Sequence, residues 1–149
     1  MIQNATSYSV APLEFLVGKY LPDFKGSITV KTDDALLDKF SGGGMEIQAL
    51  TDRNKYAPFY TIAVRSDVAS DIDHILCHEF CHLMQMNDGR LSLDMASKVF
   101  TWEGKKYSGA YPYMSRPWEV EAMRMEVAYI QEYNASQKPK KCKCKLFHI

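Results

Sequence analysis

Apolar residues recur at intervals of three and four positions in several stretches of the chain, which is the spacing of an amphipathic helix. The two longest stretches predict helices over residues 71–86 and 117–133, and a shorter one predicts a helix over residues 13–20. Asp33 and Asp34 are typical capping residues and favour a short helix that ends at Phe40. The pattern therefore predicts four helices.

Short stretches with β-branched or alternating apolar residues predict strands between these helices. They cover residues 28–31, 45–50 and 59–65, with a turn over residues 51–55. A small hairpin is expected from residues 98–102 and 105–108. Together the elements predict an α+β fold, in which a small mixed or antiparallel sheet packs on a buried helix and a second long helix follows near the carboxyl terminus.

Composition is that of an ordinary globular protein. The chain has 149 residues, of which 46% are apolar and 24% are charged, values that fit a single domain with a substantial core. We expect this domain over residues 1–137 and a basic, flexible tail over residues 138–149. The first residues resemble no signal peptide, and no run of about eighteen apolar residues occurs, so we expect no membrane association and a cytoplasmic location.

Charge is distributed unevenly along the chain. The net formal charge is zero, but the last twelve residues contain five lysines and no acidic residue, so residues 1–137 carry a formal charge of −5. The five lysines are Lys138, Lys140, Lys141, Lys143 and Lys145. Such a tail is a candidate contact for nucleic acid or an acidic partner, although a solvated terminus is the simpler interpretation.

The four cysteines do not indicate a disulfide framework. Cys77 and Cys81 lie one helical turn apart, which is poor geometry for a disulfide, so we expect buried thiols in a reducing compartment. Cys142 and Cys144 offer only two thiols, too few for a closed structural zinc site.

The central chemical motif is His78-Glu79-Phe80-Cys81-His82, in the middle of the predicted helix over residues 71–86. Residues four apart lie on one face of a helix, so both imidazoles can bind one zinc ion while Glu79 faces its water molecule. His74 lies on the same face but a turn further away, so we expect an orienting or structural role for it. The alternative is that these histidines are core residues hydrogen-bonded to backbone carbonyls.

A catalytic zinc ion usually has three protein ligands, so the two histidines need a partner from elsewhere in the chain. A helical projection of residues 117–133 places Glu119 and Glu126 within the apolar arc and Glu121 on the polar side. Because a carboxylate on a core face needs a metal or a partner, Glu119 is the expected third ligand and Glu126 a candidate to orient a histidine. Glu121 stays open as an alternative ligand, and Glu119 has the alternative role of a first-turn acid that the helix dipole favours.

The sequence His78-Glu79-x-x-His82, followed by a helix with Glu119-x-x-Ala122, resembles the gluzincin zinc metallopeptidases, especially small types from bacteria and phages. The resemblance covers residues 59–130, and its first motif is much more specific than its second. It implies that His78, His82 and Glu119 hold one zinc ion and that Glu79 acts as general base.

This chain departs from the family pattern at Met123, where several of these families have Asp or Asn. The contact that this residue usually makes behind the metal site is missing unless Glu126 replaces it. No glycine and third histidine follow His82, which argues against the metzincins.

The expected function is zinc-dependent hydrolysis of a peptide or protein substrate, in which Glu79 takes a proton from water. Five residues are candidates to stabilise the oxyanion: His74, Tyr107, Tyr111, Tyr113 and Arg116. We expect the substrate to lie extended along the strand over residues 59–64, as an added strand at a sheet edge. Two alternatives are a non-catalytic protein that uses zinc for stability or partner binding, and a zinc amide hydrolase with a non-peptide substrate.

Overall fold

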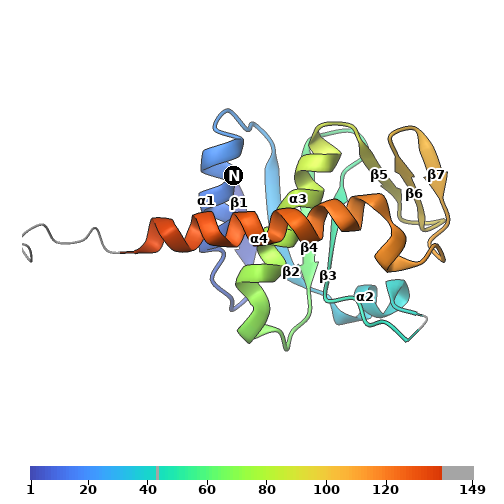
Figure 1. Ribbon diagram of the computed structural model, residues 1–149, viewed down its shortest axis with the longest axis horizontal. Coiled ribbons are helices and arrows are strands. Elements are labelled where there is room, and N and C mark those ends of the chain that lie inside the picture. Colours follow the sequence, from blue (N-terminus) through green and yellow to red (C-terminus); the bar gives the residue numbers. More distant parts are fainter. Residues whose placement is uncertain (43, 139–149) are drawn as a thin grey trace, which may run out of the picture.

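The computed structural model describes residues 1–42 and 44–138, which form four helices and two small sheets (Figure 1). The α+β class expected from the sequence is confirmed. Apart from Lys138, the predicted tail with its other four lysines and its two cysteines lies outside the described residues.

The larger sheet has four strands, which in spatial order are β1 (Ile2–Ala5), β2 (Ser27–Thr32), β4 (Phe59–Val64) and β3 (Ala49–Arg53). β2 runs parallel to both β1 and β4, whereas β3 runs antiparallel to β4. Ile28, Val30 and Ile62 are fully buried, since alternate side chains of these strands face the core. Because β4 lies inside the sheet, the expectation that a substrate adds to it as to an edge is wrong, and β3 is the edge strand on that side.

The position of β3 also differs from the sequence prediction of a strand over residues 45–50. Its ladder with β4 extends to the pair of Arg53 and Tyr60, so residues 51–53 continue the strand instead of forming a turn. Upstream of β3, the backbone carbonyls of Ile47 and Gln48 accept hydrogen bonds from the Arg65 side chain and backbone N–H. A distant arginine therefore holds the stretch that the hydropathy pattern assigns to a strand.

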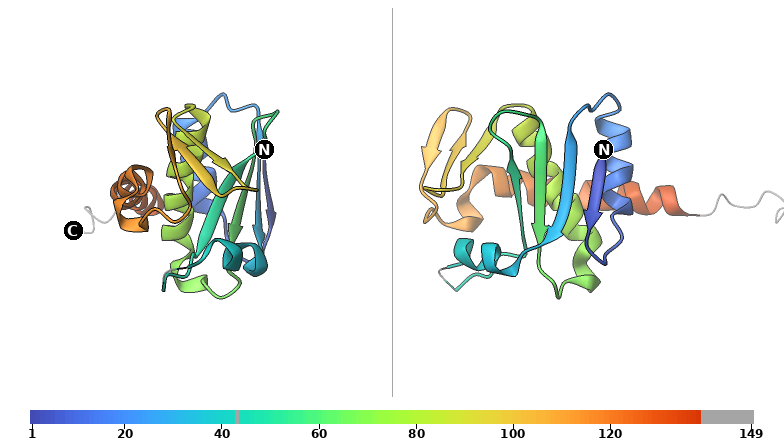
Figure 2. Two further views of the ribbon diagram at one scale, coloured as in Figure 1. Left: turned by 90° about the vertical axis from the view of Figure 1, so that its right-hand side faces the viewer. Right: turned by 180° about the vertical axis from the view of Figure 1, so that it is seen from behind.

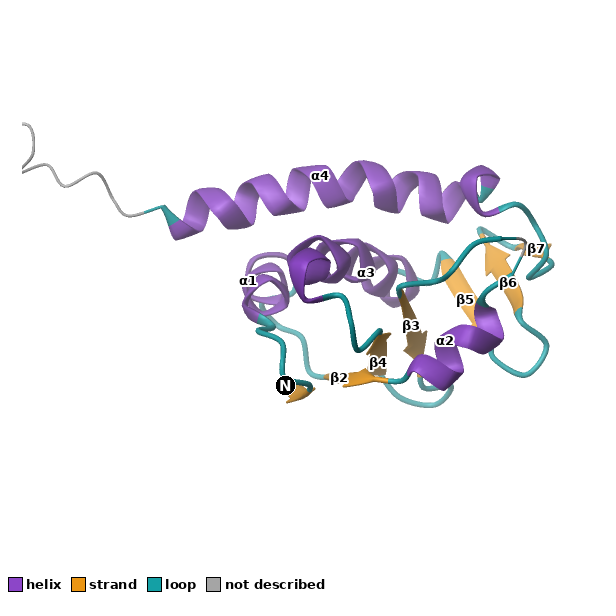
Figure 3. Cartoon of the chain, turned by 90° about the horizontal axis from the view of Figure 1, so that it is seen from below, coloured by secondary structure: helices purple, strands orange, loops and turns teal. Residues whose placement is uncertain are grey.

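Three helices cover one face of the larger sheet in two layers (Figures 2 and 3). α1 (Ala11–Tyr20) and α3 (Ile72–Asn87) lie against the strands, and α4 (Pro117–Gln137) lies outside α3. α3 is held by its apolar side chains, of which Leu76 and Phe80 are fully buried. Within the described residues, no helix combines the length and apolar character needed to cross a bilayer.

Two shorter elements complete the fold. α2 (Asp34–Phe40) begins at the predicted cap, where the Asp33 carboxylate accepts a 3.0 Å hydrogen bond from the backbone N–H of Leu36. The smaller sheet is antiparallel and has three strands, β5 (Leu91–Asp94), β6 (Val99–Trp102) and β7 (Lys105–Tyr107). Its Phe100 stacks on Trp118 with a centroid distance of 5.0 Å, which fixes the start of α4.

Candidate metal centre

Two helices bring three side chains with metal-binding groups together. His78 and His82 lie one turn apart on α3, and Glu119 lies in the first turn of α4. Oε1 of Glu119 lies 2.9 Å from Nε2 of His78 and 3.0 Å from Nε2 of His82. The three residues predicted as ligands therefore surround one point.

The distances from Glu119 to the two imidazoles are close to those between ligands of a small divalent cation. Tetrahedral coordination by bonds of about 2.05 Å separates neighbouring ligand atoms by about 3.3 Å, only slightly more than the distances to Oε1 of Glu119. Donor atoms of His78, Glu79 and His82 also lie within 4.8 Å of one another, so this group could hold a metal ion. Of the two glutamates, Glu119 is the better placed ligand, because it touches both imidazoles whereas Glu79 is hydrogen-bonded to Thr51.

The orientation of the His82 ring follows from the side-chain amide of Gln85. Nε2 of Gln85 lies 3.0 Å from two acceptors, the backbone oxygen of Trp118 and Oε1 of Glu121. The amide oxygen of Gln85 must therefore be the atom 2.8 Å from Nδ1 of His82. Because Nδ1 donates to this oxygen, the lone pair of neutral His82 lies on Nε2, which faces Glu119.

Glu126 orients His78 in the same way. Its Oε1 lies 3.0 Å from Nδ1 of His78, and its Oε2 lies 3.2 Å from Nδ1 of His74. The predicted contact between Glu126 and a histidine is thus present. The alternative of a core histidine is wrong for His74, because 57% of its side chain is exposed near the start of α3.

The Nε2 lone pairs of neutral His78 and His82 converge on the carboxylate oxygen of Glu119, and these three atoms repel one another unless a positive charge lies between them. Burial alone would lower the pKa of His78, but hydrogen bonds with Glu119 and Glu126 outweigh it and raise the pKa to about 10. Glu119 likewise raises the pKa of His82 against the effect of burial, and both histidines hold the pKa of Glu119 below its usual range. A bound cation can take the place of these protons.

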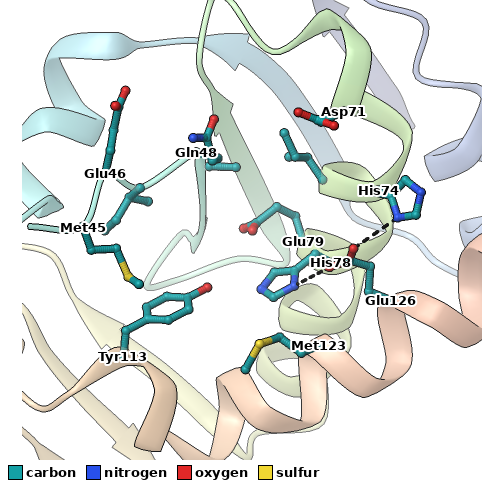
Figure 4. A pocket seen from close by; sticks show the side chains of 13 residues that line it. Met45, Glu46, Gln48, Asp71, His74, His78, Glu79, Tyr113, Met123 and Glu126 are labelled. Carbon is teal, nitrogen blue, oxygen red and sulfur yellow. Dashed lines mark hydrogen bonds and ion pairs between the residues drawn. The ribbon is translucent and has the colours of Figure 1, made fainter.

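Glu79 lies beside this point and faces a cavity of about 640 Å³ (Figure 4). The residue is 4% exposed, and its Oε1 accepts a 2.7 Å hydrogen bond from the Thr51 hydroxyl. In the described chain, Trp118 Nε1 is the only fully enclosed side-chain nitrogen or oxygen without a partner. The Oε2 atom of Glu79 also has no hydrogen-bond partner among the described residues, and because it is not fully enclosed it is accessible to solvent.

Of the five candidates for oxyanion stabilisation, Tyr113 lies nearest the candidate ligands. Its hydroxyl donates a 2.8 Å hydrogen bond to Oε1 of Glu119, and its ring lies across the cavity from Glu79 (Figure 4). Burial and the Glu119 charge both raise the pKa of Tyr113, so it stays a hydroxyl donor. Tyr107 and Tyr111 instead pack against each other, with a centroid distance of 5.0 Å.

Arg116 and Glu121 have partners outside the group of candidate ligands. The Arg116 guanidinium donates hydrogen bonds to two backbone carbonyls, and Glu121 accepts two from Arg90, at 2.8 and 3.0 Å. Glu121 reaches the histidines only through Gln85. The structure thus brings Glu119, and not Glu121, to the imidazoles.

Sequence reasoning misses two residues of this site. Gln85 carries a signal, because a glutamine among apolar helical residues needs a buried partner. Thr51 carries none, since it falls in a predicted turn and reaches Glu79 only through the pairing of β3 with β4.

Comparisons with protein-family models, with curated proteins and with solved structures found no match for this chain.

Proposed function

We propose that the chain is a zinc-dependent hydrolase that cleaves peptide bonds. In this proposal His78, His82 and Glu119 hold one zinc ion, and Glu79 is the general base. The observation that carries the proposal is the convergence of both Nε2 atoms on one oxygen of Glu119, with the carboxylate of Glu79 beside them. The resemblance of the motif to gluzincins points the same way.

Zinc suits this set of donors better than other common metal ions. Two imidazoles and one carboxylate, with a fourth position left for water, are typical of catalytic zinc, whereas calcium and magnesium prefer oxygen ligands throughout. When bound at such a site, zinc acidifies water and polarises a carbonyl group.

Each of the protein's own groups has a task in this reaction. Thr51 holds one oxygen of the Glu79 carboxylate and leaves the other accessible, so Glu79 can take a proton from water and pass it to the leaving nitrogen. The Tyr113 hydroxyl, which donates to Glu119 at 2.8 Å, can donate to the oxygen that becomes negative in the transition state. Gln85 and Glu126 keep both imidazoles oriented.

The open cavity beside Glu79 favours catalysis over a purely structural zinc site. A structural site is closed by four protein ligands, whereas three candidate ligands converge here and the adjoining cavity has a volume of about 640 Å³. A zinc amidase that acts on a non-peptide substrate would use the same groups, so the choice between peptide and non-peptide substrates is a separate outcome of the test.

The first test is metal content. We expect about one zinc ion per purified chain, and its loss in His78→Ala, His82→Ala and Glu119→Ala. Glu121→Ala is the matched control from the same helix and should retain zinc. Loss of zinc with Glu121 but not with Glu119 would contradict the proposed ligand set.

The second test is hydrolysis of a mixed synthetic peptide library, followed by mass spectrometry. Glu79→Gln keeps an oxygen for the Thr51 hydroxyl, so it should fold and bind zinc but lose cleavage by at least about a hundredfold. Glu14→Gln, at an exposed position of α1, is the control and should cleave normally. If the unaltered zinc-loaded protein cleaves no peptide, the peptidase proposal fails.

A further inference from the structure

Three hollows meet beside the candidate metal centre. The cavity of about 640 Å³ is joined by a small inner cavity of about 50 Å³ and an outer groove of about 560 Å³, and Ile47 and Tyr113 line all three. The inner cavity connects the candidate centre to the outer groove, because His82 and Glu119 line it together with Arg116. A substrate bound at the centre can therefore extend in either direction.

The two larger hollows differ in the sign of their charge. The described residues that line the outer groove include Lys39, Lys98 and Arg116 and no acidic residue. Those that line the 640 Å³ cavity include four acids and neither lysine nor arginine. A carboxylate of the substrate is therefore attracted to one end of the cleft and repelled from the other.

Arg116 is a buried cation without a carboxylate partner. Only 8% of the residue is exposed, and no salt bridge joins it to another described residue. Its Nε and Nη2 donate to the backbone oxygens of Tyr111 and Gly109, at 3.0 and 2.8 Å. The rings of Phe100 and Trp118 lie within 6.0 Å of the guanidinium carbon, and such rings stabilise a cation without neutralising it.

One nitrogen of Arg116 is left to bind something else. Nη1 makes no hydrogen bond to the described residues. Trp118 Nε1 is the one unpartnered side-chain atom of these residues that is fully enclosed, so Nη1 is accessible to solvent. Arg116 lines both the inner cavity and the outer groove. Buried charges are usually paired, and an anion at this place would complete the pair.

Trp118 provides a second, independent observation. Its Nε1–H is fully enclosed and has no hydrogen-bond acceptor among the described residues, and its side chain lines the inner cavity next to Arg116. A buried N–H donor costs free energy unless an acceptor reaches it. The wall of the inner cavity thus contains the unpaired cation of Arg116 and, beside it, a tryptophan whose donor is unpaired.

We propose that the inner cavity and the outer groove form a carboxylate-binding subsite, in which Arg116 and Lys98 recognise an anionic group of the substrate next to the bond that is cut. The proposal rests on the hydrolase function proposed above. The carboxylate comes from an acidic side chain or from the carboxyl terminus of the peptide, and these two sources share the same chemistry.

Binding can be measured separately from cleavage. Fluorescently labelled eight-residue peptides are titrated against zinc-loaded Glu79→Gln, in which cleavage is suppressed. One peptide carries an internal glutamate and an amidated end, a second has no acidic residue but a free carboxyl terminus, and a third has neither. We expect at least one of the first two to bind about tenfold more tightly than the third, and the one that does so identifies the source.

The lysines are the safer positions to alter, because Arg116 also anchors a loop. Adding Lys39→Met and Lys98→Met to the Glu79→Gln protein should reduce its preference for the carboxylate-bearing peptide to about threefold or less, since exposed charges contribute modestly. Lys106→Met removes an exposed lysine of β7 and is the matched control, which should keep the full preference. Raised salt concentration should weaken only the binding of the preferred peptide.

The outcomes separate the two proposals. Equal binding of all three peptides overturns the carboxylate subsite, and a full preference that survives the loss of both lysines overturns the role proposed for Lys98. Cleavage of peptides without this preference leaves the hydrolase proposal standing and the subsite refuted. A carboxylate preference in binding, combined with no cleavage by the unaltered protein, supports the subsite and refutes the peptidase.

Discussion

Replacement of Gln85 by leucine is expected to destabilise the metal-free protein. Gln85 is fully buried, and its amide joins Nδ1 of His82, the backbone oxygen of Trp118 and the carboxylate of Glu121. Leucine has a similar size but no polar atom. The donor on His82 would then lie unpaired inside the protein, whereas the Trp118 oxygen keeps the α-helical hydrogen bond from the backbone N–H of Ala122.

The magnitude follows from the number of groups that lose their partners. Each buried group left without a hydrogen bond costs about 1–3 kcal/mol, and one such group, Nδ1–H of His82, loses its partner here. Glu121 adds little, because its side chain is 25% exposed and Arg90 still binds both of its oxygens. A loss of this size is measurable against the roughly 5–15 kcal/mol that stabilises a typical domain.

Equilibrium urea unfolding in the presence of a chelator measures this effect without any contribution from metal. Gln131→Leu, at an exposed position of α4, is the control and should change the free energy of unfolding by less than about 0.5 kcal/mol. Zinc affinity of Gln85→Leu should also fall by about 10–100-fold, because the His82 ring is no longer oriented. A free energy of unfolding equal to that of the control would show that the amide does not carry these bonds.

Three further predictions test the fold and the site. Gly26→Ala should lower the melting temperature, because a Cβ at this position would lie 1.9 Å from a backbone oxygen. A Cβ at Gly18 would have no atom within 4 Å, so Gly18→Ala should stabilise α1 by about 0.5–1 kcal/mol. Equal melting temperatures of the two variants would contradict this reasoning. Thr51→Val should reduce kcat about tenfold with zinc content unchanged, and an unaltered kcat would show that its hydroxyl does not position the general base. The metal-free protein should lose stability as the pH rises from 6.5 toward about 10, where His78 loses its proton. It should also lose stability as the pH falls below 4.5, where Glu119 gains a proton. Unfolding curves across this pH range provide the check, and added zinc should flatten the loss on the alkaline side.

Local periodicity predicts the helices well, because the three-to-four-residue spacing of apolar side chains is a property of each helix alone. It also predicts that Glu119, and not Glu121, faces the core of the molecule, since the two lie on different sides of one helix. His74 shows the limit of this reasoning. A helical projection places it in line with the other histidines, but it cannot tell how much of each position the neighbouring elements cover. Glu126 of α4 contacts His74, yet 57% of the His74 side chain is exposed.

Contacts that depend on distant segments are not predictable in this way. The start of β3 depends on Arg65, whose guanidinium and backbone N–H bind the carbonyls just before the strand. β1 is exposed at three of its four residues, so no alternation indicates it. Thr51 meets Glu79 only because β3 pairs with β4 in one particular register.

Gln85 also explains why the third candidate ligand can be in place before any metal binds. Its amide oxygen accepts from His82 on α3 and its amide nitrogen donates to the backbone of Trp118, the residue directly before Glu119. Trp118 is held from the other side by Phe100 of the smaller sheet. The start of α4 is thus joined to α3 by one buried amide and to β6 by one aromatic stack, and it cannot move away from the histidines without breaking both. Because this arrangement exists in the fold itself, a cation would replace protons at a preformed site, and little of its binding free energy would be spent on moving the helices.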